Sequence, residues 1–347
     1  MKTLRTLFSG GELFGVGARH AGYRHLDGYE IEPTIAAVAQ LNGFDVRVAD
    51  VCAVEYATLP PADHLHASPS CKNASQARQP GTDAHGEKLP RETAQDLACA
   101  DAVCRAIAAH QGDTCTLENV WFYRTFESFD RIRAALSAAG FSYEYWHLNA
   151  ADYGVPQTRK RLILIARRGL CRVQRPHPTH RQGGDMFHAP WVGWYAAIED
   201  ILHTLPPTQP APWQQQRLPK EICESILLQS KNTGQQWGDG TRGAGEPAFS
   251  ITTDPKPSHM PKAYLLAGDN ARVDTGEPIV RRADEPAMTM RSTRTPAHRA
   301  YVGRWVRMTI QALGRFQAVP DDYRGLTPEI NGNGVPCLLA RRIMESL

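Results

Sequence analysis

Two side chains in the first half of the chain have the chemistry of a catalytic pair. Cys71 lies in a Pro-Ser-Cys-Lys turn at 69–72, directly after a short strand-like segment at 64–68. Glu118 stands at the end of a second such segment and begins the sequence Glu-Asn-Val. A thiolate is a strong nucleophile, and a protonated carboxyl group can donate to a ring on which negative charge develops. Because open α/β sheets bind ligands at the carboxyl ends of their strands, we expect both side chains in one site.

Basic residues gather in two stretches of the sequence, although the net charge is only +3. Residues 151–175 contain seven Lys or Arg and one acid, and residues 281–307 contain seven Arg and two acids. The first stretch includes Arg159 and Arg161, and a buried strand is predicted at 161–166. The two stretches are either separate solvated faces or, if they meet in space, one phosphate-binding surface.

The N-terminal region has the layout of a nucleotide-binding unit. A predicted strand at 4–8 runs into Ser9-Gly10-Gly11, and Glu30 lies 20 residues after Gly10. The glycines allow a ligand to approach the backbone, and the carboxylate can accept hydrogen bonds from ribose hydroxyls. Asp50 follows a third segment, at 44–48, and is placed to reach an adenine amine. The glycine spacing is not that of the dinucleotide fingerprint, so NAD is not favoured.

The elements expected around these residues indicate an α/β fold with a second, irregular domain. The length of 347 residues is typical of about two domains. Apolar periodicity predicts helices around 97–107 and 122–136, and a last helix at 336–347. After about residue 168 the pattern changes to proline-rich turns with few helical periods. This region contains a weak repeat with an offset of 39 residues, and Ala-Tyr follows each copy, at 263–264 and 300–301.

The order of these motifs resembles that of the DNA (cytosine-5) methyltransferase family. The resemblance rests on the glycine loop, the Pro-Ser-Cys turn, Glu-Asn-Val at 118–120, Gln-x-Arg-x-Arg at 157–161 and Gly-Asn-Gly-Val at 332–335. It covers residues 1–168 and 303–347. It implies a Rossmann-like S-adenosylmethionine-dependent methyltransferase domain at 1–168 for catalysis and cofactor binding, and a smaller, irregular target-recognition domain at 169–302. The C-terminal segment, 303–347, is expected to return to the catalytic domain.

Three features depart from the family pattern. Ser70 and Lys72 replace a proline and a glutamine around the cysteine, and Glu12-Leu13 replaces two glycines of the cofactor loop. Ala312 stands where the penultimate motif of the family carries a glutamate. We expect the first two to affect rate and cofactor affinity, and the third to affect the joint between domains. Because both catalytic candidates are retained, we expect an active enzyme.

The resemblance implies a role for each candidate residue. Cys71 would add to C6 of a cytosine flipped out of duplex DNA, so that C5 can accept a methyl group from S-adenosylmethionine. Glu118, kept protonated, would bind N3, Arg161 would hold the cytosine O2, and Arg159 would support the thiolate or Glu118. The implied cofactor-binding residues are Phe8, Ser9, Gly10, Glu30, Ile31, Asp50, Val51, Asn333 and Gly334. The implied DNA-binding residues are Lys72, Arg78, Gln157, Arg291 and Arg294, of which the last two are the candidates for guanine contacts.

The composition bears on metal binding, membrane insertion and cellular location. The eight cysteines include no Cys-x-x-Cys pair, which argues against a metal site. No run of 18 apolar residues occurs, so no membrane span is expected. In the absence of a signal peptide, we expect a cytoplasmic, bacterial or phage-encoded monomer whose partner is double-stranded DNA.

Two other functions stay open. A tRNA cytosine methyltransferase would share the chemistry, but its Cys-Phe-Thr signature does not occur, and Cys223 is followed by Glu-Ser. A catalytically silent DNA-binding protein on the same fold is mildly favoured by Glu12-Leu13 in the cofactor loop, and disfavoured by the retained catalytic candidates. Methyl transfer to duplex DNA and to tRNA distinguishes all three.

Overall fold

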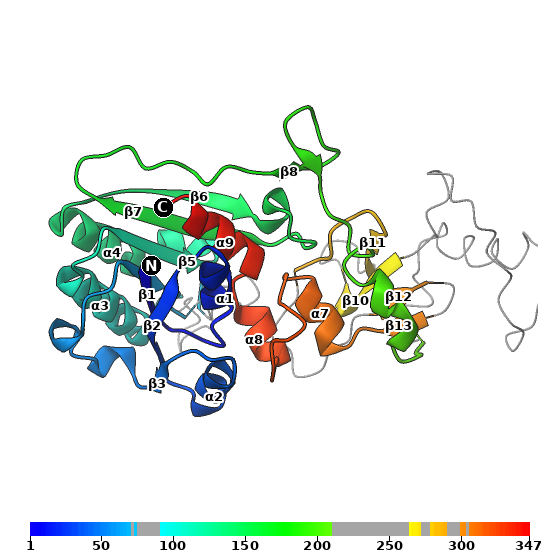
Figure 1. The fold of residues 1–347 in the computed structure, drawn as a ribbon, viewed down its shortest axis with the longest axis horizontal. Coiled ribbons are helices and arrows are strands. Elements are labelled where there is room, and N and C mark those ends of the chain that lie inside the picture. Colours follow the sequence, from blue (N-terminus) through cyan, green and yellow to red (C-terminus); the bar gives the residue numbers. More distant parts are fainter. Residues whose placement is uncertain (71–72, 75–90, 210–263, 272–277, 290–298, 303–304) are drawn as a thin grey trace, which may run out of the picture.

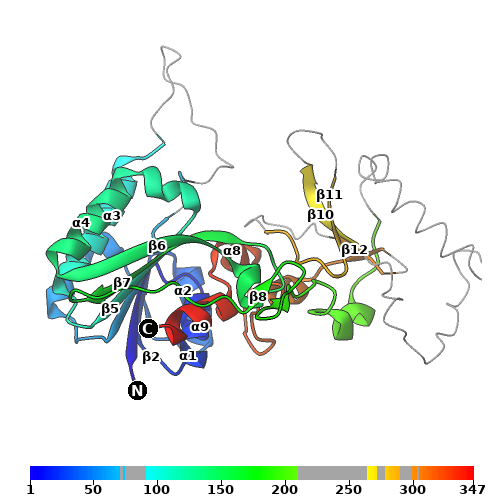
Figure 2. The ribbon, with the colours of Figure 1, turned by 90° about the horizontal axis from the view of Figure 1, so that it is seen from above.

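The structure is a computed structural model of the chain, drawn in Figure 1. It describes residues 1–70, 73–74, 91–209, 264–271, 278–289, 299–302 and 305–347. Five predicted site residues lie outside the described residues: Cys71, Lys72, Arg78, Arg291 and Arg294. Figures 1 and 2 show two units side by side, a sheet covered by helices and a smaller unit of short strands.

The larger unit is built on a seven-stranded sheet with the order β3-β2-β1-β4-β5-β7-β6. Its strands are β1 (Thr3–Leu7), β2 (Arg24–Glu30), β3 (Val46–Val48), β4 (His64–Ala67), β5 (Thr114–Asn119), β6 (Phe141–Asn149) and β7 (Lys160–Arg168). Strands β1 to β5 pair in parallel, and β7 runs antiparallel to both of its neighbours. The carboxyl ends of β1, β2, β4 and β5 therefore lie at one edge of the sheet.

Helices cover both faces of this sheet (Figures 1 and 2). Helices α3 (Ala94–Ala109) and α4 (Glu127–Ala138) pack on one face, against apolar residues such as Leu65 and Leu117. Helices α1 (Leu13–His20) and α9 (Cys337–Glu345) pack against each other on the opposite face, around Leu4. Helices α2 (Pro33–Leu41) and α8 (Pro328–Asn333) pack beside α1.

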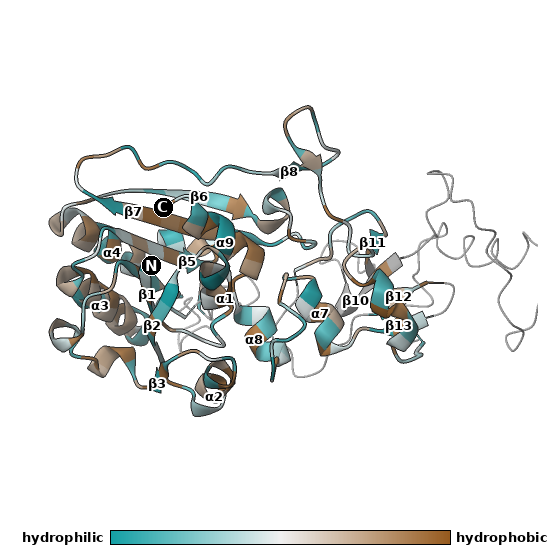
Figure 3. Ribbon diagram, in the orientation of Figure 1, coloured by the Kyte–Doolittle hydropathy of each residue, from teal (hydrophilic) through white to brown (hydrophobic). Residues whose placement is uncertain are grey.

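Short 3-10 segments connect several of these elements: Val51–Ala53, Tyr56–Thr58, Trp121–Thr125, Ala150–Tyr153 and Glu199–Thr204. Figure 3 shows hydrophobic colouring on β7, which is buried inside the sheet, and hydrophilic colouring on β2. The polar residues of β2 lie beneath the N-terminal loop, where they form the network described below.

The smaller unit has a four-stranded antiparallel sheet with the order β11-β10-β12-β13. Its strands are β10 (Tyr264–Ala271), β11 (Pro278–Arg282), β12 (Arg299–Tyr301) and β13 (Trp305–Arg307), and β8 (His180–Arg181) pairs separately with β9 (Ala189–Pro190). Tyr264 pairs with Tyr301, so the Ala-Tyr ends of the two repeat copies are neighbours. The first copy, around 246–259, lies outside the described residues.

The hydrophobic core of the smaller unit includes Trp194, Leu265, Val306 and Phe316, and helix α7 (Ile310–Arg315) packs in it. This core therefore continues beyond position 302, where the sequence predicts the second domain to end. The chain returns to the larger unit from about Val319 onward, and α8 and α9 follow there. Within the described residues, no helix has the length and apolar character needed to cross a bilayer.

Candidate active site

The turn that leads to Cys71 is held between two strand ends. The Ser68 hydroxyl donates a hydrogen bond to the carbonyl of Phe8, at 3.3 Å, just after β1. The Asn119 amide, at the end of β5, donates to the carbonyl of Pro69, at 2.9 Å. Although Cys71 itself lies outside the described residues, the turn that precedes it is fixed beside both the glycine loop and the end of β5.

Glu118 is buried at the end of β5 beside an arginine from β7. Glu118 is 6% exposed, and its Oε1 lies 3.0 Å from Nε of Arg161. Burial raises the pKa of the Glu118 carboxyl, and the nearby charges of Arg161 and Arg159 offset this only in part. The site therefore favours the protonated carboxyl more than water does, which suits a proton donor.

Arg159 connects three parts of the site. Its side chain is almost fully buried, at 1% exposure, and Nη2 donates to the carbonyl of Gly332, at 2.9 Å. Its backbone N–H donates to Oδ1 of Asn149, at the end of β6, at 3.1 Å. The Gln-x-Arg-x-Arg segment is thereby joined to the C-terminal Gly-Asn-Gly-Val segment.

The loop after β1 has an unusual backbone. Phe8, Gly10 and Glu12 all have positive φ angles, of 56°, 54° and 61°. The Gly10 N–H donates to Oε2 of Glu30, at 2.9 Å, which joins the loop to the end of β2. No described atom lies within 4 Å of the place where a Cβ on Gly10 would stand, so the backbone there is open to a ligand. Ile31, next to Glu30, leaves its apolar side chain 63% exposed.

The remaining predicted cofactor residues lie around this loop. Asp50 is exposed, and its Oδ1 accepts a hydrogen bond from the N–H of Cys52, at 2.8 Å. The side chain of Val51 is buried in the core, so only its backbone is available to a ligand. Asn333 is exposed at the end of α8, and a Cβ on Gly334 would lie 2.5 Å from Leu13 of α1.

A cleft of about 870 Å³ lies between the two units. Lys160 and Arg161 line it from the first basic stretch, and Arg281 lines it from the second, together with Asp284 and Glu285. Thr158 and Thr289 add hydroxyl groups to its wall. The two basic stretches therefore meet in space, and the interpretation of two separate solvated faces does not hold at this point.

Gln157 lies at the junction of the two units rather than on their surface. It is fully buried, and neither atom of its side-chain amide has a hydrogen-bond partner within the described residues. Next to it, the Thr158 N–H donates to the carbonyl of Ala287, at 2.8 Å, and the Ala287 N–H donates to the carbonyl of Pro156, at 2.9 Å. The sequence predicts a DNA contact for Gln157, but in this structure its amide is covered by the second unit.

The segment 73–92 is predicted from its sequence to close over a flipped base, and most of it lies outside the described residues. Both of its ends are anchored. The Asn73 amide donates to Oδ2 of Asp96, at 2.7 Å, and the Glu92 carboxylate accepts from the N–H groups of Glu127 and Ser128, both at 2.8 Å. The segment therefore starts and ends at the N-termini of α3 and α4.

Two functional candidates were not identified from the sequence. Asn119 holds the turn before Cys71, and Asn149 orients the backbone of Arg159 and lines the cleft. Asn119 belongs to the Glu-Asn-Val motif, so the motif itself could have indicated it. Asn149 ends β6, a strand that was not predicted, and no local signal marks it.

The sheet order, the open loop at Gly10 and the buried acid at the strand ends define a Rossmann-like methyltransferase. The fold is similar to that of a structure described as a DNA modification methyltransferase encoded within a prophage (E. coli), with a TM-score of 0.62, 16% identity and coverage of 100% of this chain and 98% of that chain. It is also similar to DNMT2 of Spodoptera frugiperda, with a TM-score of 0.57, 13% identity and coverage of 100% and 99%.

The family model of C-5 cytosine-specific DNA methylases matches residues 3–347, and the chain belongs to this family. It is 25% identical over 250 residues to the type II methyltransferase M.AquIA of Picosynechococcus sp., which covers 65% of this chain and 97% of that protein. It is 22% identical over 360 residues to the type II methyltransferase M1.HphI of Haemophilus parahaemolyticus, covering 98% and 85%. The predicted family, fold class and enzyme class are thereby confirmed.

Proposed function

We propose that this DNA cytosine-5 methyltransferase acts on a cytosine flipped out of a specific double-stranded site, with S-adenosylmethionine as methyl donor and Cys71 as nucleophile. The observation that carries the proposal is the buried Glu118–Arg161 pair. It lies where the basic cleft meets the turn that leads to Cys71. A proton donor and a cation are thus available to the same edge of a base that enters the cleft.

The residues around the glycine loop fit S-adenosylmethionine. The open backbone at Gly10 can approach the methionine part, and the Glu30 carboxylate can accept hydrogen bonds from ribose hydroxyls. The exposed Ile31 offers an apolar face to the adenine ring, and Asp50 can accept from its amine. Phe8, Ser9, Val51, Asn333 and Gly334 complete the proposed site. When bound, S-adenosylmethionine supplies an electrophilic methyl group.

Cys71 and Glu118 act together on the ring. The Cys71 thiolate forms a bond to C6, and the electron pair of the C5–C6 double bond is displaced toward C5 and the ring. Protonated Glu118 donates to N3 and so stabilises the negative charge that develops. After C5 has taken the methyl group, a base removes the C5 proton, the double bond is restored, the C6–S bond breaks to release Cys71, and the proton on N3 returns to the Glu118 carboxylate. We assign no residue to this base.

The two arginines orient the base and the acid. Arg161 lies beside Glu118 on the wall of the cleft, where its guanidinium can hold the cytosine O2. Arg159 is too deeply buried for a surface contact, and its charge faces Glu118 from within the site. We therefore propose that Arg159 supports the thiolate or the carboxyl group rather than the DNA.

DNA binding is proposed to use both units. The cleft supplies Lys160 and Arg281, and these cations can neutralise phosphates. The predicted contacts of Lys72, Arg78, Arg291 and Arg294 lie outside the described residues and stay proposals, with guanine reading assigned to the last two. Flipping is required because stacked neighbours cover the faces of a paired cytosine, where C6 is attacked and C5 accepts the methyl group. The recognition role of the second unit is part of the same proposal.

The test is transfer of a tritiated methyl group from S-adenosylmethionine to duplex DNA and to tRNA, with Cys71→Ser as the paired variant. We expect transfer to duplex DNA by the wild type, loss of transfer in Cys71→Ser with cofactor binding retained, and a covalent adduct with 5-fluorocytosine DNA only in the wild type. Transfer to tRNA alone would favour the tRNA enzyme. DNA binding without transfer would favour the silent protein.

A further inference from the structure

A carboxylate is buried directly beneath the cofactor loop. Glu12 stands where the family's loop carries a glycine, yet it is only 1% exposed and its φ of 61° is in the left-handed region. A non-glycine residue in this region is strained, and it persists only where the surrounding structure holds it. The contacts of Glu12 show what holds it.

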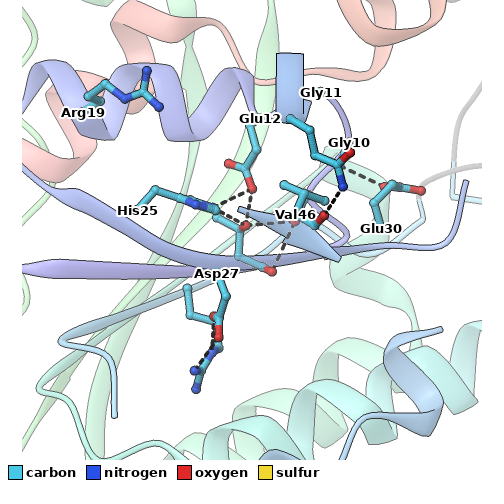
Figure 4. A network of polar contacts seen from close by, with 12 residues as sticks. Gly10, Gly11, Glu12, Arg19, His25, Asp27, Glu30 and Val46 are labelled. Atoms are coloured by element: carbon cyan, nitrogen blue, oxygen red, sulfur yellow. Dashed lines mark hydrogen bonds and ion pairs between the residues drawn. The ribbon is translucent and has the colours of Figure 1, made fainter. Parts of the chain in front are cut away.

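The Glu12 carboxylate is bound by two neighbouring strands (Figure 4). Oε1 accepts a hydrogen bond from the hydroxyl of Thr6 on β1 and lies 3.0 Å from Nε2 of His25 on β2. The Thr6 hydroxyl also lies 2.9 Å from Oγ of Ser9 in the loop. The carboxylate is therefore linked through strand side chains to a residue of the proposed cofactor site.

Two glycines leave room for the carboxylate. A Cβ on Gly28 of β2 would lie 2.7 Å from Oε1 of Glu12, and a Cβ on Gly15 would overlap Oε2. Gly15 lies inside α1, where glycine is less favourable than alanine. Each carboxylate oxygen thus occupies the space of an absent side chain, and the interior here is shaped around Glu12.

The loop is fixed on its other side as well. The Ser9 N–H donates to the carbonyl of Tyr29, at 3.0 Å. The Gly10 N–H donates to Glu30, at 2.9 Å, as Figure 4 shows. We propose that Glu12 is a positioning residue that acts through Thr6 and His25 to hold Ser9 and Gly10 in the conformation that binds S-adenosylmethionine. The inference rests on the proposed function, because it takes this loop as the cofactor site.

The same two strands offer a matched control. Arg5 Nε lies 2.6 Å from Oδ1 of Asp27, and both residues are buried. Arg5 pairs with Asp27 in the register, one position before Thr6 pairs with Gly28, so the two pairs point to opposite faces of the sheet. Figure 4 shows Asp27 on the side away from Glu12. Asp27→Asn therefore removes a buried charge from the same strand without changing the loop network.

The experiment measures the dissociation constant of S-adenosylmethionine for the full chain by calorimetry, together with its thermal unfolding. Glu12→Gly relieves the strained backbone but removes the carboxylate, and we expect it to weaken cofactor binding roughly 10- to 100-fold. Glu12→Gln keeps the shape and an acceptor for the Thr6 hydroxyl, so its affinity stays within about threefold of the wild type. Asp27→Asn should lower the unfolding temperature and leave cofactor affinity within the same limit.

Two further variants keep the test decisive. Thr6→Val preserves the shape of the strand residue but breaks the link between Glu12 and Ser9, and it should weaken cofactor binding even if Glu12→Gly does not fold. Gly15→Ala should weaken binding in the wild type, where the new methyl group meets the carboxylate. In the Glu12→Gly background the same change should cost less affinity, because only the contact with the Phe44 ring, at 2.9 Å, is then left.

The outcomes separate the inference from the proposed function. A wild-type chain that does not bind S-adenosylmethionine overturns both. A wild-type chain that binds it, with Glu12→Gly and Thr6→Val binding equally well, overturns the positioning role of Glu12 alone. Equal losses of affinity in Asp27→Asn and Glu12→Gly also overturn it, because the effect would then follow general stability. Weaker binding confined to the loop-network variants, with DNA affinity unchanged, supports it.

Discussion

Replacing Glu118 by glutamine removes the proton that the side chain can donate while keeping the shape of the side chain. The amide is nearly isosteric, and its oxygen can still accept from Arg161, whose Nε lies 3.0 Å from the wild-type carboxylate. It cannot transfer a proton to N3. Loss of a general acid typically slows a reaction by about 10²- to 10⁴-fold, which corresponds to roughly 2.7–5.4 kcal/mol in the barrier. We expect the methyl-transfer step of Glu118→Gln to slow by this amount.

The pKa of Glu118 predicts how stability changes with pH. Because burial raises this pKa, the folded protein binds the proton more tightly than the unfolded chain does. The contribution of Glu118 to the free energy of unfolding therefore decreases as pH rises from the pKa of the unfolded chain, about 4.3, through the raised pKa of the folded protein. Glutamine does not titrate, so Glu118→Gln should be at least as stable as the wild type at neutral pH.

The assay is single-turnover methyl transfer to duplex DNA, followed by rapid quenching over a range of pH. In the wild type, the rate should fall as pH rises through the raised pKa of Glu118, because the carboxyl group loses its proton. In Glu118→Gln this decrease should be absent and the rate low throughout. A persisting decrease in the variant, or a large loss of DNA affinity with unchanged turnover of bound DNA, would refute proton donation by Glu118.

Three further predictions follow from other parts of the molecule. Asn119→Ala removes the hydrogen bond to the Pro69 carbonyl, so we expect turnover to fall roughly 3- to 10-fold with unchanged cofactor affinity, measured by steady-state kinetics. Burial lowers the pKa of His66 to about 3, so stability is lost as pH falls below about 6.5, where the unfolded histidine binds a proton and the native one does not. His66→Phe should reduce that loss by about 1.4 kcal/mol per pH unit in denaturant titrations, and an unchanged slope would contradict it. Arg291→Ala and Arg294→Ala should each relax the methylated sequence at one position, at a cost of about 1–3 kcal/mol, whereas uniformly weaker methylation at an unchanged site would indicate phosphate contacts.

The elements that end at the site could be predicted because each carries a local signal. The segment at 64–68 contains apolar Leu65 and Ala67, the segment at 161–166 is a mostly apolar run, and the structure has β4 and β7 there. The helix predicted around 97–107 lies within α3, which begins with a capping box formed by Thr93 and Asp96. The strand β6 was not predicted, because its middle residues are only partly buried and give no clear alternation.

The position of Gln157 could not be predicted, because backbone pairing across a long sequence separation determines it. The carbonyl of Ala287 accepts hydrogen bonds from Thr158, and no pattern of side chains in the sequence predicts such a contact. The C-terminal boundary of the second unit could not be predicted either, because it too depends on packing between residues that lie far apart in the sequence. Val306 and Phe316 follow the motif order of the catalytic unit, yet they pack in the core of the smaller one.

This junction brings the proposed recognition and the proposed chemistry to one place in the chain. Thr158, whose N–H donates to the carbonyl of Ala287, directly precedes Arg159 and lies three residues before Arg161. On the other side, the Thr289 hydroxyl donates to the carbonyl of Thr158, at 2.6 Å, and Thr289 directly precedes the segment that contains the two arginines assigned to guanine reading. Hydrogen bonds of the backbone are less easily displaced than contacts between exposed side chains. A shift of the recognition segment on its DNA would therefore be passed through Thr158 to Arg159 and Arg161, so we expect recognition of the site and positioning of the base to be coupled.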